Sequence, residues 1–178
     1  DTLVENAGQG ITSGTSTYSS KSSFGRRKVL SQLQGMGINS GSYSWNWASP
    51  EYTSYYTDET GNLHIVAWKD QTLYDAVCNS DLNVTNVTTV KLPLPLWGGF
   101  YAAPDGNFYV AVGQKNLNED NSITAVRILQ YSRAWKLLGA TDIGGGYTNM
   151  FEGIYIPFDA ASLRMTQIGS TLIVHTGR

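Results

Sequence analysis

After residue 50 the chain is built of short segments in which apolar residues either alternate with polar ones or run together. Gly, Asn, Asp and Pro separate these segments, and this combination is typical of β-strands joined by tight turns. The pattern predicts strands at 52–57, 63–68, 72–78, 84–92, 99–103, 108–113, 123–131, 135–143, 163–167 and 171–176.

One strand motif occurs three times, at Gly61–Trp68, Gly106–Gly113 and Gly169–Thr176. Each copy is a turn glycine followed by an apolar strand, which is how a β-hairpin enters a sheet. The intervals are long enough for several strands per unit, as in the blades of a β-propeller. We therefore expect an all-β protein, a partial propeller of four-stranded antiparallel blades.

The blades are expected at 51–95 and 96–146, with an incomplete third blade at 147–178, about two and a half blades in all. Residues 1–50 are rich in Ser, Thr and Gly and predict an irregular N-terminal region. One short helix is expected there near residues 25–35, where Val29, Leu33 and Met36 would share a face.

An arc of this size cannot close a ring, because a propeller typically needs about four to eight blades. The remaining sheet edges must then be covered by other material. We expect either another chain or a remaining part of the same polypeptide to complete the propeller.

Composition narrows the class of protein. Only 15% of residues are charged, while Gly, Tyr and Trp are abundant, which suits strands and turns. With a net charge of −2, the protein has no overall positive electrostatic field that would attract nucleic acid. No apolar run reaches the roughly 18 residues that a membrane-spanning helix needs. The low lysine content and the many Ser, Thr, Asn and Tyr residues resemble exported bacterial proteins, so an extracellular or cell-surface location is expected.

Residues 94–176 resemble a group of uncharacterised secreted β-propeller proteins of Gram-positive bacteria. The motifs that carry the resemblance are Leu96–Tyr101, Gly113–Asn116 with Glu119 and Asp120, Ala125–Tyr131, Trp135–Gly139, and Ile156–Ala160 leading to Ser162–Met165. The resemblance implies a propeller fold and an extracellular setting. It implies no catalytic residue.

Aromatic residues are the main candidates for ligand binding. Trp45 and Trp47 are two positions apart, so on a strand they would face the same side, with Tyr55 nearby. Exposed, they could stack on sugars or anchor a protein; buried, they would pack between blades. Gln114 and Asn116 join the candidates because they lie in the best-matched loop of the resemblance.

The acidic loop that follows supplies the only metal candidates, Asn118, Glu119 and Asp120. Their oxygen atoms suit Ca²⁺, but the order of an EF-hand loop is missing, which favours a solvated turn between two strands. No other cofactor is expected.

These features favour a non-enzymatic extracellular binding or scaffold module that recognises a surface glycan or a protein partner. Two alternatives remain. One is a carbohydrate-active enzyme that uses a pair of loop carboxylates, among them Asp105, Glu119, Asp120 and Asp142. The other is a structural segment of a surface assembly completed by another chain.

Overall fold

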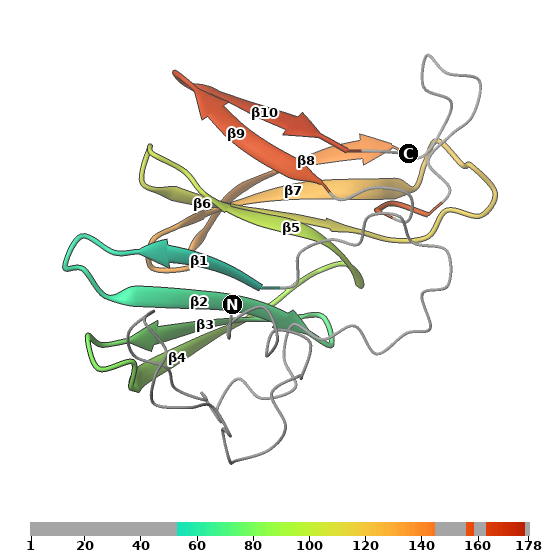
Figure 1. Ribbon diagram of the computed structural model, residues 1–178. Helices are drawn as coiled ribbons and strands as arrows, with labels where there is room; N and C mark the ends of the chain where they lie inside the picture. Colours follow the sequence, from blue (N-terminus) through green and yellow to red (C-terminus); the bar gives the residue numbers. More distant parts are fainter. Residues whose placement is uncertain (1–52, 145–155, 159–162, 177–178) are drawn as a thin grey trace, which may run out of the picture.

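The computed structural model describes residues 53–144, 156–158 and 163–176, and this part of the chain is all-β (Figure 1). It contains no helix, and hence no helix that could cross a membrane. The helix expected near residues 25–35 lies outside the described residues. The predicted all-β class and the four-stranded antiparallel sheets are confirmed.

The first sheet is a meander in which every strand pairs with the next one along the chain. It consists of β1 (Thr53–Thr57), β2 (Leu63–Lys69), β3 (Thr72–Cys78) and β4 (Val84–Lys91). All pairs are antiparallel, and a bulge interrupts the β3–β4 register near Cys78. The connections are short turns, and strands joined by short turns pair with one another as antiparallel neighbours, which produces this order.

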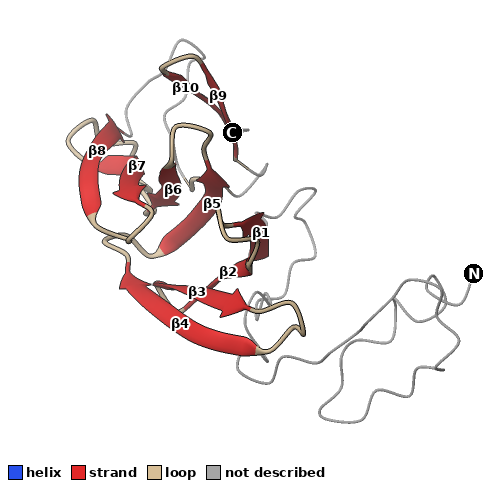
Figure 2. Cartoon of the chain, turned by 90° about the vertical axis from the view of Figure 1, so that its left-hand side faces the viewer, coloured by secondary structure: helices blue, strands red, loops and turns tan. Residues whose placement is uncertain are grey.

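The second sheet repeats the same topology. It consists of β5 (Leu96–Ala102), β6 (Asn107–Gly113), β7 (Thr124–Ser132) and β8 (Leu137–Gly144). The two sheets lie face to face as layers, and Figures 1 and 2 show the same stacking from two directions. A third, two-stranded sheet made of β9 (Arg164–Ile168) and β10 (Thr171–His175) lies on the other side of the second sheet.

One turn geometry recurs between the strands. The carbonyl of the first residue accepts a hydrogen bond from the N–H of the fourth, and the fourth residue has a positive φ. The turns begin at Asp58, Asn79, Ala103, Asn116 and Ser132, and the left-handed residues are Gly61, Leu82, Gly106, Glu119 and Trp135. The turns are tight, and their fourth residue must adopt a positive φ, which glycine tolerates best. Glycine therefore occupies two of these five positions.

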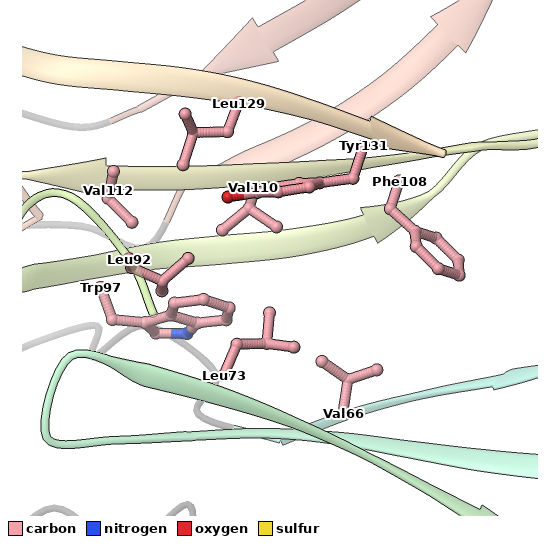
Figure 3. Close-up of a cluster of buried hydrophobic side chains, with 9 residues drawn as sticks. All are labelled: Val66, Leu73, Leu92, Trp97, Phe108, Val110, Val112, Leu129 and Tyr131. Atoms are coloured by element: carbon pink, nitrogen blue, oxygen red, sulfur yellow. The ribbon is translucent and has the colours of Figure 1, made fainter. Parts of the chain in front are cut away.

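The main core fills the space between the two four-stranded sheets (Figure 3). The first sheet contributes Val66 and Leu73, and Leu92 and Trp97 pack at the crossing from one sheet to the next. The second sheet contributes Phe108, Val110, Val112, Leu129 and Tyr131. Alternation along each strand places these side chains on one face, so the stacking of the sheets follows directly from the pattern.

A second core lies between the other face of the second sheet and the β9–β10 hairpin. Tyr109, Ala111, Val126 and Ile128 point from the sheet into this layer, where they meet Phe158, Leu163, Met165, Leu172 and Val174. The second sheet is therefore buried on both faces, which explains the continuous apolar run along β6.

Gly113 shows how tight this second core is. A Cβ at this position would lie 2.7 Å from the backbone oxygen of Ala125 and 2.9 Å from Cγ of Pro157. We expect Gly113→Ala to lower the free energy of unfolding by about 1–3 kcal/mol, because backbone must move to make room. Urea denaturation would measure it. Gly139→Ala, where a Cβ meets nothing within 4 Å, is the matched control and should be neutral or slightly stabilising.

Candidate functional site: an aspartate-centred cluster between the sheets

The most densely connected polar group in the described residues lies at one end of the interface between the first two sheets. Tyr56, His64 and Asp75 come from neighbouring strands of the first sheet. Direct pairing of Tyr56 with His64, and the alternation of β3, bring the three side chains onto the face that meets the second sheet. Trp135 reaches them from the β7–β8 turn of the second sheet.

Asp75 is the centre of the cluster and is only 3% exposed. Its Oδ2 accepts hydrogen bonds from the Tyr56 hydroxyl at 2.9 Å and from the Trp135 indole N–H at 2.7 Å. Its Oδ1 lies 2.8 Å from Nδ1 of His64. A buried carboxylate is tolerated when its oxygens are satisfied in this way, and here one of the donors belongs to a different sheet.

His64 extends the cluster toward the surface. Its Nε2 lies 3.3 Å from Oδ2 of Asp58, and its ring stacks on Tyr56 with centroids 4.3 Å apart. The Asp58 carboxylate is fixed by hydrogen bonds from Asn62 and Thr60. These bonds, with the Asn62 side chain contributing most, hold the pKa of Asp58 well below its usual range.

Aromatic rings surround the polar centre. The Trp135 ring packs on Phe108 with centroids 4.6 Å apart, and Phe108 also contacts Tyr56 and Phe100. The guanidinium of Arg133 lies 4.6 Å above the Phe108 ring, in cation–π geometry, and donates to the carbonyl of Ala103. The turn that carries Arg133 and Trp135 is thus held against both sheets.

Trp135 occupies a left-handed backbone conformation, with φ of 59°. A bulky residue rarely adopts this conformation, and its cost must be offset by contacts elsewhere. The indole hydrogen bond to Asp75 and the tilted packing of the indole ring on Phe108 supply those contacts. The cluster therefore holds the first sheet against the second.

Burial, together with the nearby Asp75, raises the pKa of Tyr56 far above its ordinary value. Tyr56 stays protonated in the folded protein, whereas the same tyrosine ionises in the unfolded chain once the pH exceeds its ordinary pKa. This ionisation stabilises the unfolded chain relative to the folded protein. We therefore expect the free energy of unfolding to fall above about pH 10, by at most about 1.4 kcal/mol per pH unit for this group.

Tyr56→Phe should make that decline shallower, and denaturation midpoints between pH 8 and about pH 11 would measure it. Burial also raises the pKa of Tyr131, so some of the decline should remain. A decline of unchanged steepness in Tyr56→Phe would contradict the assignment.

A smaller polar cluster joins the second sheet to the hairpin. Asp105, in the β5–β6 turn, accepts hydrogen bonds from Tyr109 at 2.9 Å and from the Gln167 side chain at 3.0 Å. Burial acts to raise the pKa of Asp105, but the hydrogen bonds from Asn107, Tyr109 and Gln167 outweigh it and hold the pKa below its usual value. Both sheet interfaces therefore have an aspartate that accepts hydrogen bonds from two sheets.

The ligand-binding residues expected from the sequence lie in separate places. Tyr55 is on β1 and is 66% exposed. Gln114 and Asn116 lie in the β6–β7 loop, where Gln114 donates to the Thr124 carbonyl and the buried Asn116 bonds to Asp120. Trp45 and Trp47 lie outside the described residues. The side-chain amides of Gln114 and Asn116 thus stabilise the loop.

The proposed metal loop is stabilised by internal hydrogen bonds. Oδ1 of Asp120 accepts from the N–H and the hydroxyl of Ser122, and these bonds lower its pKa. Asn118 and Glu119 lie in the turn that begins at Asn116. Within the described ranges, no group of three or more His, Cys, Asp or Glu side chains gathers around a possible cation position. Calcium binding stays a prediction.

The Asp75 cluster was missed by the sequence analysis, although one signal was present. Asp75 interrupts the apolar strand Thr72–Cys78, and a carboxylate in a buried strand requires partners. The sequence gives no indication that one partner, Trp135, would come from the following sheet.

Comparison of the chain with protein-family models, with curated proteins and with solved structures finds no match. What the protein does must therefore be inferred from its own geometry.

Proposed function

We propose that the chain is an arc of a β-propeller and acts as an extracellular, non-enzymatic binding or scaffold module whose partner is a protein. The propeller proposal is supported by two four-stranded meanders that follow one another in sequence and stack face to face. The β9–β10 hairpin stacks on the second sheet as a third sheet would. Radial repetition of such sheets is the propeller architecture.

The observation that carries the binding proposal is a pair of exposed isoleucines on the outer face of this hairpin. Ile168 and Ile173 are 66% and 43% exposed and belong to neighbouring strands. By contrast, aliphatic side chains are buried between the first and second sheets and between the second sheet and the hairpin. Apolar side chains left exposed beside a buried core are a common feature of protein interfaces.

A protein partner is favoured over a glycan by the kind of residue that is exposed. Sugar-binding surfaces offer aromatic faces for stacking, but Tyr55 is the only aromatic among the large exposed apolar residues of the described chain. The others are aliphatic: Val87, Leu117, Leu137, Leu138, Ile143, Ile168 and Ile173.

Three of the candidate carboxylates in the described part of the chain also favour binding over glycoside hydrolysis. A glycosidase needs one acid whose pKa is raised so that it can protonate the leaving group. The pKa values of Asp105, Asp120 and Asp142 are all lowered. Asp142 is paired with Arg127, whose two nitrogens donate at 2.5 and 2.6 Å. Asp105 and Asp120 stabilise turns, and Asp142 stabilises the pairing of β7 with β8.

The test is a direct comparison of ligand classes with the full chain. Purified protein is applied to an array of bacterial surface polysaccharides and to an array of extended peptides, and reducing-sugar release is measured in parallel. We expect saturable binding to peptides with alternating apolar residues. Binding to polysaccharides alone would overturn the protein-partner proposal. Sugar release that Asp105→Asn abolishes would replace it with the enzyme.

A further inference from the structure

His64 lies between two carboxylates, one in the buried interface and one in a turn near the surface. Its Nδ1 is 2.8 Å from Oδ1 of Asp75, and its Nε2 is 3.3 Å from Oδ2 of Asp58. The His64 side chain is only 12% exposed, and that of Asp58 is 29% exposed. The imidazole ring therefore connects the buried centre of the cluster to the β1–β2 turn, which begins at Asp58.

The hydrogen-bond partners of His64 determine how many hydrogens its ring carries. The Tyr56 hydroxyl donates its hydrogen to Oδ2 of Asp75, so it presents only its oxygen to Nδ1, which is 2.7 Å away. Nδ1 thus faces two acceptors, this oxygen and Oδ1 of Asp75, while Nε2 faces the Asp58 carboxylate. A histidine with acceptors at both nitrogens is satisfied as an imidazolium, in which both nitrogens are donors.

The charges around the ring agree with this arrangement. Buried charges are normally paired, and the other two donors to the buried Asp75, a phenol and an indole, are neutral. The low pKa of Asp58 keeps that carboxyl ionised as well. The guanidinium of Arg133, from the β7–β8 turn, lies 5.6 Å from the centroid of the Tyr56 ring and donates to a backbone carbonyl. His64 is therefore the group in position to give Asp75 a hydrogen-bonded positive partner.

We propose that His64 is a proton switch in the joint between the first and second sheets. As an imidazolium it holds the β1–β2 turn to Asp75, the same carboxylate that binds the Trp135 indole of the second sheet. When the Nε2 proton passes to water, a lone pair faces the Asp58 carboxylate and Asp75 loses its charged partner. The turn and the joint between the sheets are then both weakened. This device is independent of which partner the protein binds.

The Nε2 hydrogen is the one that leaves first. Nδ1 makes the shorter contact, at 2.8 Å, with the more deeply buried carboxylate of Asp75, whereas Nε2 is 3.3 Å from the more exposed Asp58. The amides of Thr60 and Asn62 donate to the Asp58 carboxylate and therefore report any movement of it.

NMR of the full chain tests the protonation. The ring nitrogen shifts of His64 are followed as the pH is raised through and beyond the range in which histidine ordinarily titrates. The chain has one other histidine, the exposed His175, which serves as an internal reference. We expect His64 to begin with two ring hydrogens and to lose the one on Nε2. The Trp135 indole and the Thr60 and Asn62 amides should shift along the same curve.

Urea denaturation across the same pH range tests the joint. A proton that is held in the folded protein and released by the unfolded chain makes folding less favourable as the pH rises. We expect the ratio of folded to unfolded protein to fall by at most about tenfold per pH unit, until His64 is deprotonated in the folded protein too. A ratio that stays constant or rises across this range would contradict the proposal.

Asp58→Asn removes the surface carboxylate and provides an amide that can donate to a neutral Nε2. This variant should lose most of the pH dependence of the folded-to-unfolded ratio. Glu59→Gln makes the same change of net charge at the neighbouring exposed position and is the matched control, which should keep the dependence. Equal behaviour of the two variants would show that net charge, and not the His64 contact, is the cause.

The wild-type titration decides the proposal even if Asp58→Asn does not fold. A single ring hydrogen on His64 at every pH, or a proton found on Asp75 in place of Nδ1, would overturn the assignment of the imidazolium. Loss of the Nε2 hydrogen with no accompanying shift at Thr60, Asn62 or Trp135 would overturn the switch. Shifts that follow the His175 curve would do the same.

Discussion

Asp75→Ala is expected to lower the free energy of unfolding by about 3–5 kcal/mol, because it removes the acceptor of a buried hydrogen-bonded cluster. The Tyr56 hydroxyl, the Trp135 indole and Nδ1 of His64 all lie within 2.9 Å of this carboxylate. Without it, the Trp135 indole N–H loses its acceptor, and the Tyr56 hydroxyl and Nδ1 of His64 keep only the 2.7 Å contact with each other. Urea denaturation of the full chain, followed by tryptophan fluorescence, would measure the change.

Two companion variants give the result its meaning. Asp75→Asn keeps the shape and one acceptor oxygen, so its loss should be roughly half as large. Glu59→Ala, in the exposed β1–β2 turn, removes a carboxylate that lies outside the cluster and should change stability by less than about 0.5 kcal/mol. If Asp75→Ala were no worse than Glu59→Ala, the cluster would not be what fixes the first sheet against the second.

Local patterning predicted the strands of this protein well. The segment Thr72–Cys78 was predicted with the bounds that the structure has, and the strands near 63–68 and 171–176 differ by one residue. These strands have alternating or continuous apolar residues and clear turn residues at both ends. Such signals lie within a few positions of each other, so no knowledge of the fold is needed to interpret them.

The start of β5 was predicted too late, at residue 99 in place of Leu96. The prolines before it and the two glycines within it argue against a strand. In the structure a bulge between Trp97 and Gly99 accommodates the irregularity. At Gly98 an added Cβ would lie 2.5 Å from the Phe158 ring, so a glycine is required there by close packing. That requirement arises from a residue distant in sequence.

The Asp75 cluster could not be predicted from the pattern of apolar and polar residues, because its members are distant in sequence. Its members are Tyr56, His64, Asp75 and Trp135, and only the strand register and the stacking of two sheets bring them together. A period-two pattern assigns each residue to a face of its own strand, but it does not say which turn of the next sheet will meet that face. The aromatic candidates chosen from the sequence, such as Tyr55, were selected for their chemistry and spacing, and Gln114 and Asn116 for a resemblance, so none of these choices depended on how the sheets stack.

Phe108→Ala should also be severe, with an expected loss of about 3–5 kcal/mol in the free energy of unfolding. Phe108 is fully buried and contacts Tyr56 of the first sheet, Phe100 of β5 and Trp135 of the β7–β8 turn. Removal of the ring would leave a cavity at the point where both sheets and the Arg133 guanidinium converge.

The matched control is Leu117→Ala, an apolar truncation at a residue that is 55% exposed, which should cost less than about 1 kcal/mol. Phe108→Leu, which refills much of the volume, should recover a large part of the loss if packing is the cause. Because Phe108 supports the left-handed Trp135, the alanine variant should also weaken the indole bond to Asp75. Combined with Asp75→Ala it should therefore cost less than the sum of the two single changes. Strict additivity would mean that the aromatic core and the aspartate cluster stabilise the sheet interface independently.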